Sequence, residues 1–246
     1  MSYIIIGASS GLGRELAYKF GENKNNLFLV SRDKRDLTPI KNDLQEKYKI
    51  SVEIVDFDFS KIEEIKSNLI PQIKKQEDLK GILFPVGLMH EKDNSDLNLE
   101  DLIKVYNANF VSIVFTVSEL KKIIKNKEFS FVGFGSVSGL LGRDINTNYA
   151  AAKRSLESFF ESLAFDNIQS SYNIHFYTLG YLQTNLAFGK NLKLPKGNVK
   201  SLANLVYKNK NQKNVKRFFP FYWSIIAAVL KLVPLKFILN IKKFLK

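Results

Sequence analysis

The strongest constraint on the fold is a regular alternation of short apolar runs with longer amphipathic segments, which starts at Tyr3. The apolar runs predict strands at residues 3–6, 27–30, 52–55, 82–86, 129–134 and 174–178. The segments between them predict helices at residues 11–20, 33–48, 61–75, 99–125 and 146–167. Because the strand runs are continuously apolar, both faces of the sheet must be covered, as in parallel sheets. The pattern therefore predicts an α/β fold with a doubly wound parallel sheet.

The chain has 246 residues, of which 45% are apolar, and this is enough for one domain with a large core. We assign residues 1–196 to the sheet domain and residues 197–246 to a C-terminal extension with basic, aromatic and amphipathic helices. The absence of cysteine excludes disulfide bonds and thiolate nucleophiles, and with only two histidines we expect no metal site. The first strand run leaves no room for a signal peptide, so we expect a cytoplasmic protein.

The net charge of +13 is unevenly distributed along the chain. Asp166 is the last acidic residue, and residues 167–246 contain 14 Lys and Arg residues. The preceding 166 residues carry 23 basic and 24 acidic groups and are nearly neutral. This asymmetry indicates an anionic surface, either lipid or nucleic acid, as a partner of the C-terminal part.

A glycine-rich turn follows the first predicted strand, with Gly7, Gly11 and Gly13 in the spacing G-x-x-x-G-x-G. Glycines there let the backbone turn tightly and approach a pyrophosphate, which binds at the N-terminus of the following helix. A plain strand–helix connection is the alternative, but the position after an N-terminal strand favours nucleotide binding. We expect a nucleotide cofactor to contact Gly7, Ser9, Ser10, Gly11, Leu12 and Gly13.

The second predicted strand ends at Ser31-Arg32, where a doubly wound sheet places the adenosine ribose. An acidic side chain at this position suits a free 2′-hydroxyl group, and an arginine suits a 2′-phosphate. Arg32, with Arg14 or Arg35 as a second cation, therefore favours NADP(H) over NAD(H). The alternative is an ordinary solvated arginine at the start of a charged helix.

Tyr149 and Lys153 are four residues apart in a predicted helix and therefore lie on one face. A free phenol is a poor proton donor or acceptor near neutral pH, and a neighbouring ammonium group brings its pKa toward the working range. Ser136, at the end of a predicted strand, is placed to hydrogen-bond a substrate carbonyl oxygen. The Y-x-x-x-K spacing alone is common by chance. Together with the glycine turn and Ser136 it predicts a catalytic site.

With these motifs the chain resembles the short-chain dehydrogenase/reductase family from residue 3 to about residue 186. The resemblance implies a Rossmann fold and an NAD(P)-dependent oxidoreductase that acts on CH–OH groups. It also implies that Asn109 holds a water molecule linking the lysine to solvent. The implied catalytic residues are Ser136, Tyr149, Lys153 and Asn109.

The family implies further cofactor contacts, made by Tyr149 and Lys153 themselves and by Asp58, Gly87, Leu182 and Thr184. Two departures from the family pattern affect the nicotinamide pocket. Residues 84–87 read Phe-Pro-Val-Gly where most members have Asn-Asn-Ala-Gly, so the side-chain hydrogen bonds that brace the sheet must come from elsewhere. Leu179-Gly180 replaces the usual Pro-Gly after the sixth strand.

Residues 215–246 differ in composition from the rest of the chain. An aromatic cluster at residues 218–223 contains the only tryptophan, Trp223, and apolar helical stretches with flanking lysines follow. This composition is typical of a helix in a membrane interface, where each lysine near an anionic leaflet contributes about 1 kcal/mol. We therefore expect peripheral binding to the inner face of the cytoplasmic membrane. The alternative is a protein interface in a homo-oligomer, and we expect no nucleic-acid partner because the aromatic residues are not spaced for base stacking.

The C-terminal sequence also resembles bacterial family members associated with surface-polysaccharide and lipid-linked sugar biosynthesis. We expect an NADPH-dependent reductase of a ketone to a secondary alcohol. A bulky or membrane-borne substrate, such as a lipid-linked keto-sugar or a 3-ketolipid, fits the tail. Two alternatives are a non-catalytic NADP-binding sensor or scaffold, and a soluble oligomeric carbonyl reductase whose tail forms the subunit interface.

Overall fold

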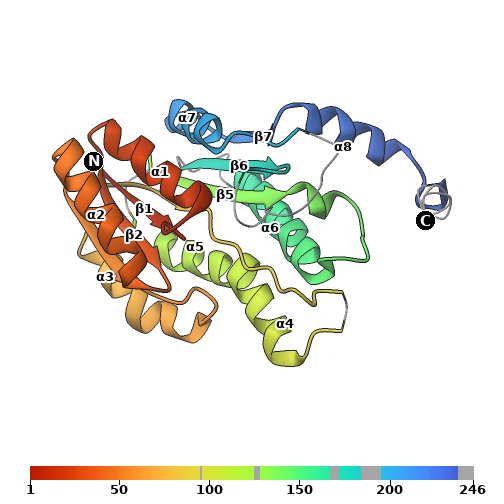
Figure 1. Cartoon of the computed structure of the whole chain (residues 1–246), viewed down its shortest axis with the longest axis horizontal. Coiled ribbons are helices and arrows are strands. Elements are labelled where there is room, and N and C mark those ends of the chain that lie inside the picture. Colours follow the sequence, from red (N-terminus) through yellow and green to blue (C-terminus); the bar gives the residue numbers. More distant parts are fainter. Residues whose placement is uncertain (95, 125–127, 167–171, 184–194, 238–246) are drawn as a thin grey trace.

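A computed structural model of the chain describes residues 1–94, 96–124, 128–166, 172–183 and 195–237. Its centre is a seven-stranded sheet with the strand order β3-β2-β1-β4-β5-β6-β7, in which all neighbouring strands are parallel (Figure 1). The predicted doubly wound α/β fold is thus confirmed. The strands are β1 (Ser2–Ile6), β2 (Asn26–Ser31), β3 (Val52–Asp56), β4 (Leu79–Phe84), β5 (Ser130–Ser136), β6 (Asn173–Leu179) and β7 (Val215–Phe219).

Helices cover both faces of the sheet. On one face the core is formed with α1 (Gly11–Glu22), α2 (Lys34–Tyr48) and α7 (Val199–Asn209), and on the other with α3 (Ile70–Lys74), α5 (Ser112–Ile123) and α6 (Thr147–Asp166). Successive residues of a strand point to opposite faces, so Tyr3 and Ile5 of β1 enter the first core and Ile4 and Ile6 the second. This two-sided burial explains the continuously apolar strand sequences.

The helix predicted at residues 99–125 is interrupted by one wider turn. It consists of α4 (Leu99–Tyr106), a π-helical turn at Asn107–Val111 and α5. The segment predicted as one helix at residues 61–75 likewise contains a 3₁₀ turn, a π-helical turn and the short α3. π-Helical turns are rare and frequently occur at functional sites. The one in the longer helix contains Asn109.

Strand β7 was not predicted, and it changes the description of the C-terminal extension. Residues from 197 onward were assigned to an appendage, but α7 packs on α1, where Tyr207 contacts Phe20 edge to face, and β7 adds a strand beside β6. As the sheet edge, β7 has only Val215 fully buried, so its sequence lacks the apolar run of a central strand. The helical appendage of the described residues therefore begins with α8 (Tyr222–Leu232).

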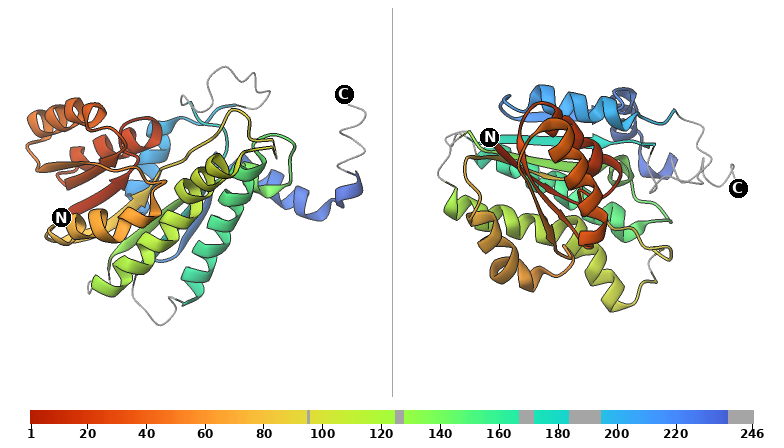
Figure 2. Two further views of the ribbon diagram at one scale, coloured as in Figure 1. Left: turned by 90° about the horizontal axis from the view of Figure 1, so that it is seen from below. Right: turned by 60° about the vertical axis from the view of Figure 1, so that its left-hand side comes forward.

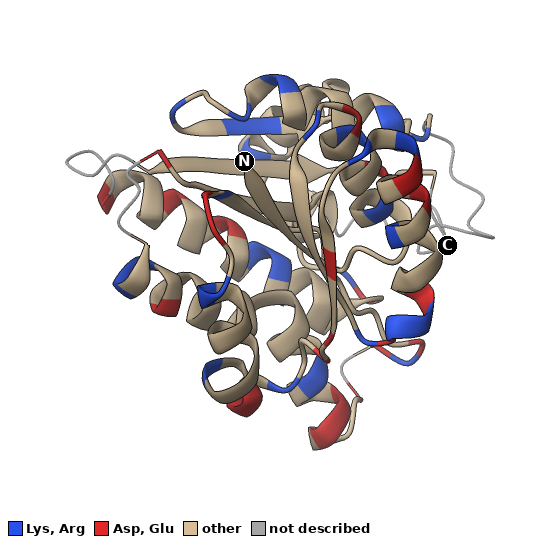
Figure 3. Ribbon diagram, turned by 90° about the vertical axis from the view of Figure 1, so that its left-hand side faces the viewer, with Lys and Arg blue, Asp and Glu red and all other residues tan. Residues whose placement is uncertain are grey.

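Helix α8 extends away from the sheet beyond the end of β7 (Figures 1 and 2). Among the described helices, none combines the length and the apolar character needed to cross a membrane. The described residues after Asp166 include lysines and one arginine, Arg217, but no Asp or Glu. Figure 3 shows basic and acidic residues on the helices around the sheet.

Candidate active site

A cleft opens at the carboxyl edge of the sheet, where the chain leaves β1 and β4 toward opposite faces. Ligands bind at this switch point in doubly wound sheets. The cleft is lined mainly by the turns that follow the strands, together with two residues from α6. Among the residues that the sequence suggested as cofactor contacts, those that line it are Gly7, Ser9, Ser10, Gly11, Leu12, Arg32, Asp58, Gly87, Tyr149, Lys153 and Leu182.

The glycine turn between β1 and α1 forms one wall of the cleft. Gly7 has a φ of 90°, and its amide donates to Val30 O at 2.8 Å. Gly13 does not line the cleft but lies directly behind the turn, where a Cβ atom would be 1.9 Å from Gly7 O. Any side chain at Gly13 would push the turn outward. With glycine at this position the turn stays close to α1, and the N-terminus of α1 is free for a pyrophosphate. The turn therefore fits a dinucleotide.

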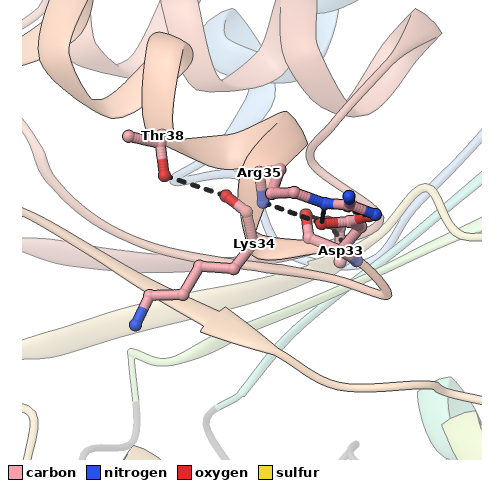
Figure 4. A network of polar contacts seen from close by, with 5 residues as sticks. Asp33, Lys34, Arg35 and Thr38 are labelled. Atoms are coloured by element: carbon pink, nitrogen blue, oxygen red, sulfur yellow. Dashed lines mark hydrogen bonds and ion pairs between the residues drawn. The ribbon is translucent and has the colours of Figure 1, made fainter.

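At the end of β2 the two candidate arginines have different surroundings. Arg32 lines the cleft. Arg35 instead hydrogen-bonds the carboxylate of Asp33, with its Nε 3.0 Å from both Oδ1 and Oδ2 (Figure 4). The hydrogen bonds from Arg35 lower the pKa of Asp33 to about 2. Asp33 also accepts the Arg35 backbone N–H at 2.8 Å and so caps α2. The carboxylate is thus engaged away from the cleft, and Arg32 is the charged side chain presented to a ribose phosphate.

Three further residues predicted to contact the cofactor follow β3 and β6. Asp58, after β3, accepts hydrogen bonds from the backbone N–H and the hydroxyl of Ser60, at 3.0 and 2.8 Å, and these fix its carboxylate at the cleft wall. Leu182, after β6, lines the cleft from the opposite side. Thr184 lies outside the described residues.

Two of the three residues proposed for proton transfer, Tyr149 and Lys153, line the cleft, and Ser136 lies next to Tyr149. Tyr149 and Lys153 come from the first turns of α6, with Lys153 Nζ 5.8 Å from the centre of the Tyr149 ring. Ser136, at the end of β5, hydrogen-bonds the Tyr149 phenol. Lys153 is 4% exposed, and its ammonium donates to Val86 O and Phe134 O at 3.3 and 3.2 Å. The fold therefore brings together residues from β5, α6 and the turn after β4.

The pKa values of this group differ from the sequence expectation. Burial raises the pKa of Tyr149 to about 12, with an opposing effect of the Ser136 hydrogen bond. Burial also lowers the pKa of Lys153 to about 7. Desolvation is the largest influence on both pKa values. Tyr149 thus keeps its proton at neutral pH, which suits a proton donor.

Asn109 is fully buried and its side chain joins two backbone segments. Its Nδ2 donates to Leu88 O and Val105 O at 2.7 and 2.8 Å, and its Oδ1 accepts from Leu88 N at 3.2 Å. These contacts show what braces the segment after β4, where the asparagines usual in the family are missing. The water-holding role of Asn109 stays a prediction.

Two polar residues that the sequence did not single out support the site. Ser138 donates to Ser136 Oγ through its hydroxyl at 2.8 Å and its backbone N–H at 3.2 Å. The proton of Ser136 is thereby directed toward Tyr149. The second residue, Asp93, is 3% exposed and its carboxylate accepts backbone N–H groups at the start of α6. The Ser-x-Ser spacing could have identified Ser138 from the sequence, whereas no local pattern marks Asp93.

A glycine turn at a helix N-terminus, a switch-point cleft and a half-buried tyrosine beside a buried lysine together define an NAD(P)-dependent oxidoreductase. The comparison with known families agrees, since the model described as short chain dehydrogenase matches residues 2–194. The chain belongs to this family, as its motifs indicated.

The curated relatives are named for two different classes of compound. The chain is 25% identical over 237 residues to hydroxysteroid 11-beta-dehydrogenase 1-like protein B of Xenopus laevis, covering 92% of this chain and 80% of that protein. It is 26% identical over 189 residues to very-long-chain 3-oxoacyl-CoA reductase of Kluyveromyces lactis, covering 74% of this chain but only 54% of that protein.

Solved structures share the fold. A short-chain dehydrogenase from Sphingobium yanoikuyae in complex with NADPH superimposes with a TM-score of 0.81 at 17% identity, covering 94% of this chain and 93% of that one. A bulky-bulky ketone specific alcohol dehydrogenase from Comamonas testosteroni gives a TM-score of 0.78 at 17% identity, covering 94% and 92%.

Proposed function

We propose that the protein is an NADPH-dependent reductase that converts a ketone to a secondary alcohol. The observation that carries this proposal is that Tyr149 and Lys153 line the dinucleotide cleft together, with Ser136 next to Tyr149. NADPH, when bound, supplies a hydride to the carbonyl carbon. Tyr149 donates its proton to the carbonyl oxygen, so that ketone, hydride and proton give the alcohol and leave NADP⁺.

The neighbouring residues orient the reactants. Ser136 accepts two hydrogen bonds from Ser138 and therefore presents its own proton to the substrate oxygen beside Tyr149. Lys153 uses two donors on backbone carbonyls, which leaves the third for the nicotinamide ribose. We assign Asn109 the positioning of the Gly87–Leu88 segment through its three backbone hydrogen bonds.

The preference for NADPH over NADH rests on Arg32. Arg32 lines the cleft at the end of β2, while the carboxylate of Asp33 is held by Arg35. A carboxylate engaged in this way does not repel a 2′-phosphate as a free one would. The fold relative from Sphingobium yanoikuyae, whose structure is a complex with NADPH, is consistent with this choice.

NADPH consumption against a panel of ketones tests the proposal. The panel contains lipid-linked keto-sugars, 3-ketoacyl compounds and ketosteroids. We expect Tyr149→Phe to abolish turnover and to retain NADPH binding, and undiminished turnover of this variant would remove the mechanism. NADPH binding without turnover of any ketone would instead favour a cofactor-binding sensor or scaffold.

A bulky or membrane-borne substrate is the second part of the proposal. The relatives include enzymes named for steroids and very-long-chain 3-oxoacyl-CoA. The nicotinamide end of the cleft is apolar, with Val86, Leu88, Leu179 and Leu182 among its lining residues. A lipid-linked keto-sugar or a 3-ketolipid offers a matching apolar body next to a reducible carbonyl.

An exposed apolar row on α8 supports attachment to a membrane surface. The exposed fractions of Phe221, Ile225, Val229 and Leu232 are 75, 59, 54 and 83%, and their spacing places them along one side of the helix. Lys231 and Lys236 are exposed nearby, and no carboxylate occurs after Asp166. An apolar row with flanking cations fits the interface of an anionic bilayer. Trp223, expected as an interfacial anchor, is buried against the body instead.

Vesicle co-sedimentation tests this attachment. Deleting residues 215–246 would remove β7, so variants on α8 are the better choice. We expect the wild-type protein to bind vesicles containing phosphatidylglycerol and the Ile225→Asn/Val229→Asn variant to lose that binding. Phe165→Asn, which replaces an apolar side chain that is 74% exposed on α6, is the matched control. A wild-type dimer in solution that the α8 variant dissociates, without vesicle binding, would favour the subunit-interface alternative.

A further inference from the structure

Trp223 joins α8 to the segment that follows β6. It is the only tryptophan of the chain and is 8% exposed. Its ring meets Tyr181 edge to face, with 6.0 Å between the ring centres. The same segment continues to Leu182, which lines the cofactor cleft. A residue of the C-terminal helix is therefore packed one residue away from a wall of the cleft.

The contact between Trp223 and Gly180 is closely fitted. A Cβ atom at Gly180 would lie 2.0 Å from Trp223 Nε1 and 2.3 Å from its Cδ1, distances that no side chain tolerates. Among the twenty residue types, only glycine at position 180 leaves room for the indole. The missing side chain at Gly180 and the tryptophan 43 residues later are therefore one feature of the fold.

Shape and not hydrogen bonding holds the indole in this position. Among the described residues, none is a hydrogen-bond partner of the buried Trp223 Nε1. A buried donor left unpaired costs about 1–3 kcal/mol, so the close packing on Gly180 and Tyr181 must outweigh this cost. The backbone on either side is also fixed, since Gly180 N donates to Phe219 O at 2.8 Å and Gly197 N donates to Tyr181 O at 2.7 Å.

We propose that Trp223 is a positioning residue of the cofactor site, which holds the Gly180–Leu182 segment against the nicotinamide end of the cleft. The C-terminal helix is then part of the enzyme's binding site as well as its outer surface. The inner side of α8, where Trp223 and Ala227 are buried, supports the segment that forms the cleft wall. The outer side of α8 carries the exposed apolar row. The inference rests on the proposed function only in taking NADPH as the ligand of the cleft.

A double-mutant cycle with the full-length protein tests this inference. We expect Trp223→Ala to raise the Kd for NADPH about 10-fold, measured by titrating the fluorescence of the nicotinamide. Gly180→Ala should have a similar effect, because its methyl group displaces the indole. The double variant should bind no worse than either single variant, since the cavity left by the tryptophan accepts the added methyl group. Trp223→Phe, which keeps a ring over Gly180, should stay within about 3-fold of wild type.

Phe221→Ala is the matched control on the same helix, because the Phe221 side chain is 75% exposed. We expect it to leave the NADPH Kd unchanged. Equal Kd values for wild type and Trp223→Ala, or additive effects in the double variant, would overturn the inference. If Trp223→Ala does not fold, as judged by its melting temperature, the NADPH Kd values of Gly180→Ala and Trp223→Phe test the inference in its place. A wild-type protein that does not bind NADPH would contradict the proposed function and not this contact.

Discussion

The carboxylate of Asp93 holds the backbone of Tyr149. Its Oδ2 accepts the Tyr149 N–H at 2.8 Å, and its Oδ1 accepts the backbone N–H and the side-chain amide of Asn148 at 2.8 and 2.9 Å. The first N–H groups of a helix lack partners within the helix, and a carboxylate there also interacts favourably with the helix dipole. Asp93 thus acts as an N-terminal cap supplied by a distant loop, and it fixes the turn that carries the proposed proton donor.

Replacing Asp93 by Asn should lower kcat more than it changes KM. One of the two carboxylate oxygens becomes an amide donor, which cannot accept from the start of α6. Loss of a helix cap costs about 0.5–2 kcal/mol, and we expect a melting temperature lower by a few degrees and a kcat lower by about 3- to 10-fold. The exposed Asp96, replaced by Asn, is the control. An unchanged kcat for Asp93→Asn would show that the cap does not position Tyr149.

Replacing Arg32 by Ala should remove the preference for NADPH. A hydrogen bond to a charged group contributes about 1.5–3 kcal/mol, which corresponds to a Kd for NADPH raised by about 10- to 100-fold. The Kd for NADH should stay within about 2-fold, because NADH has no 2′-phosphate. Lys34→Ala is the control, since Lys34 points away from the neighbouring ion pair (Figure 4). Parallel losses for both cofactors, measured by calorimetry, would contradict the assignment.

Replacing Ser138 by Ala should slow the reaction without impairing cofactor binding. The variant loses the hydroxyl that donates to Ser136 at 2.8 Å, so the Ser136 proton is no longer directed toward the substrate oxygen. One hydrogen bond contributes about 0.5–1.5 kcal/mol, and we expect kcat to fall about 2- to 10-fold with an unchanged NADPH Kd. Ser155→Ala, on the same helix as Tyr149, should have no effect. A wild-type kcat for Ser138→Ala would exclude this contribution.

Replacing Lys153 by Met should abolish turnover but stabilise the protein without cofactor. Burial lowers the pKa of Lys153 to about 7, below the value near 10.5 of the unfolded chain. The unfolded state therefore binds more protons between these pH values, and wild-type stability rises with pH across this window. The increase in the free energy of unfolding caused by Lys153→Met should be largest below pH 7 and should decline toward pH 10.5. Urea unfolding at several pH values measures it, and a pH-independent difference would be the contrary result.

The residues of the catalytic motif were predictable because local spacing determines where they lie. Tyr149 and Lys153 share a helix face through their separation of four, and Ser136 is presented at a strand end. The glycine turn is recognisable for a similar reason, since its backbone geometry and its close approach to Gly7 O require glycine. Each of these features depends on a few consecutive residues.

Other parts of the site could not be read from local patterns. β7 lies at the sheet edge and has a single buried side chain, so its sequence does not differ from that of a surface loop. The bond from Tyr149 N to Asp93 spans 56 residues, and no local motif marks Asp93. The pKa values of Tyr149 and Lys153 depend on desolvation, which a helical spacing does not reveal.

The sequence by itself determined the order of the first six strands and of the helical segments between them, the dinucleotide turn and the identity of the reactive groups, because periodicity and glycine geometry are local properties. Only the tertiary structure decided which groups support them. It placed Asp93 at the start of α6 and covered Gly180 with Trp223. These relationships arise when distant segments pack together, and packing depends on the shape and burial of many residues at once.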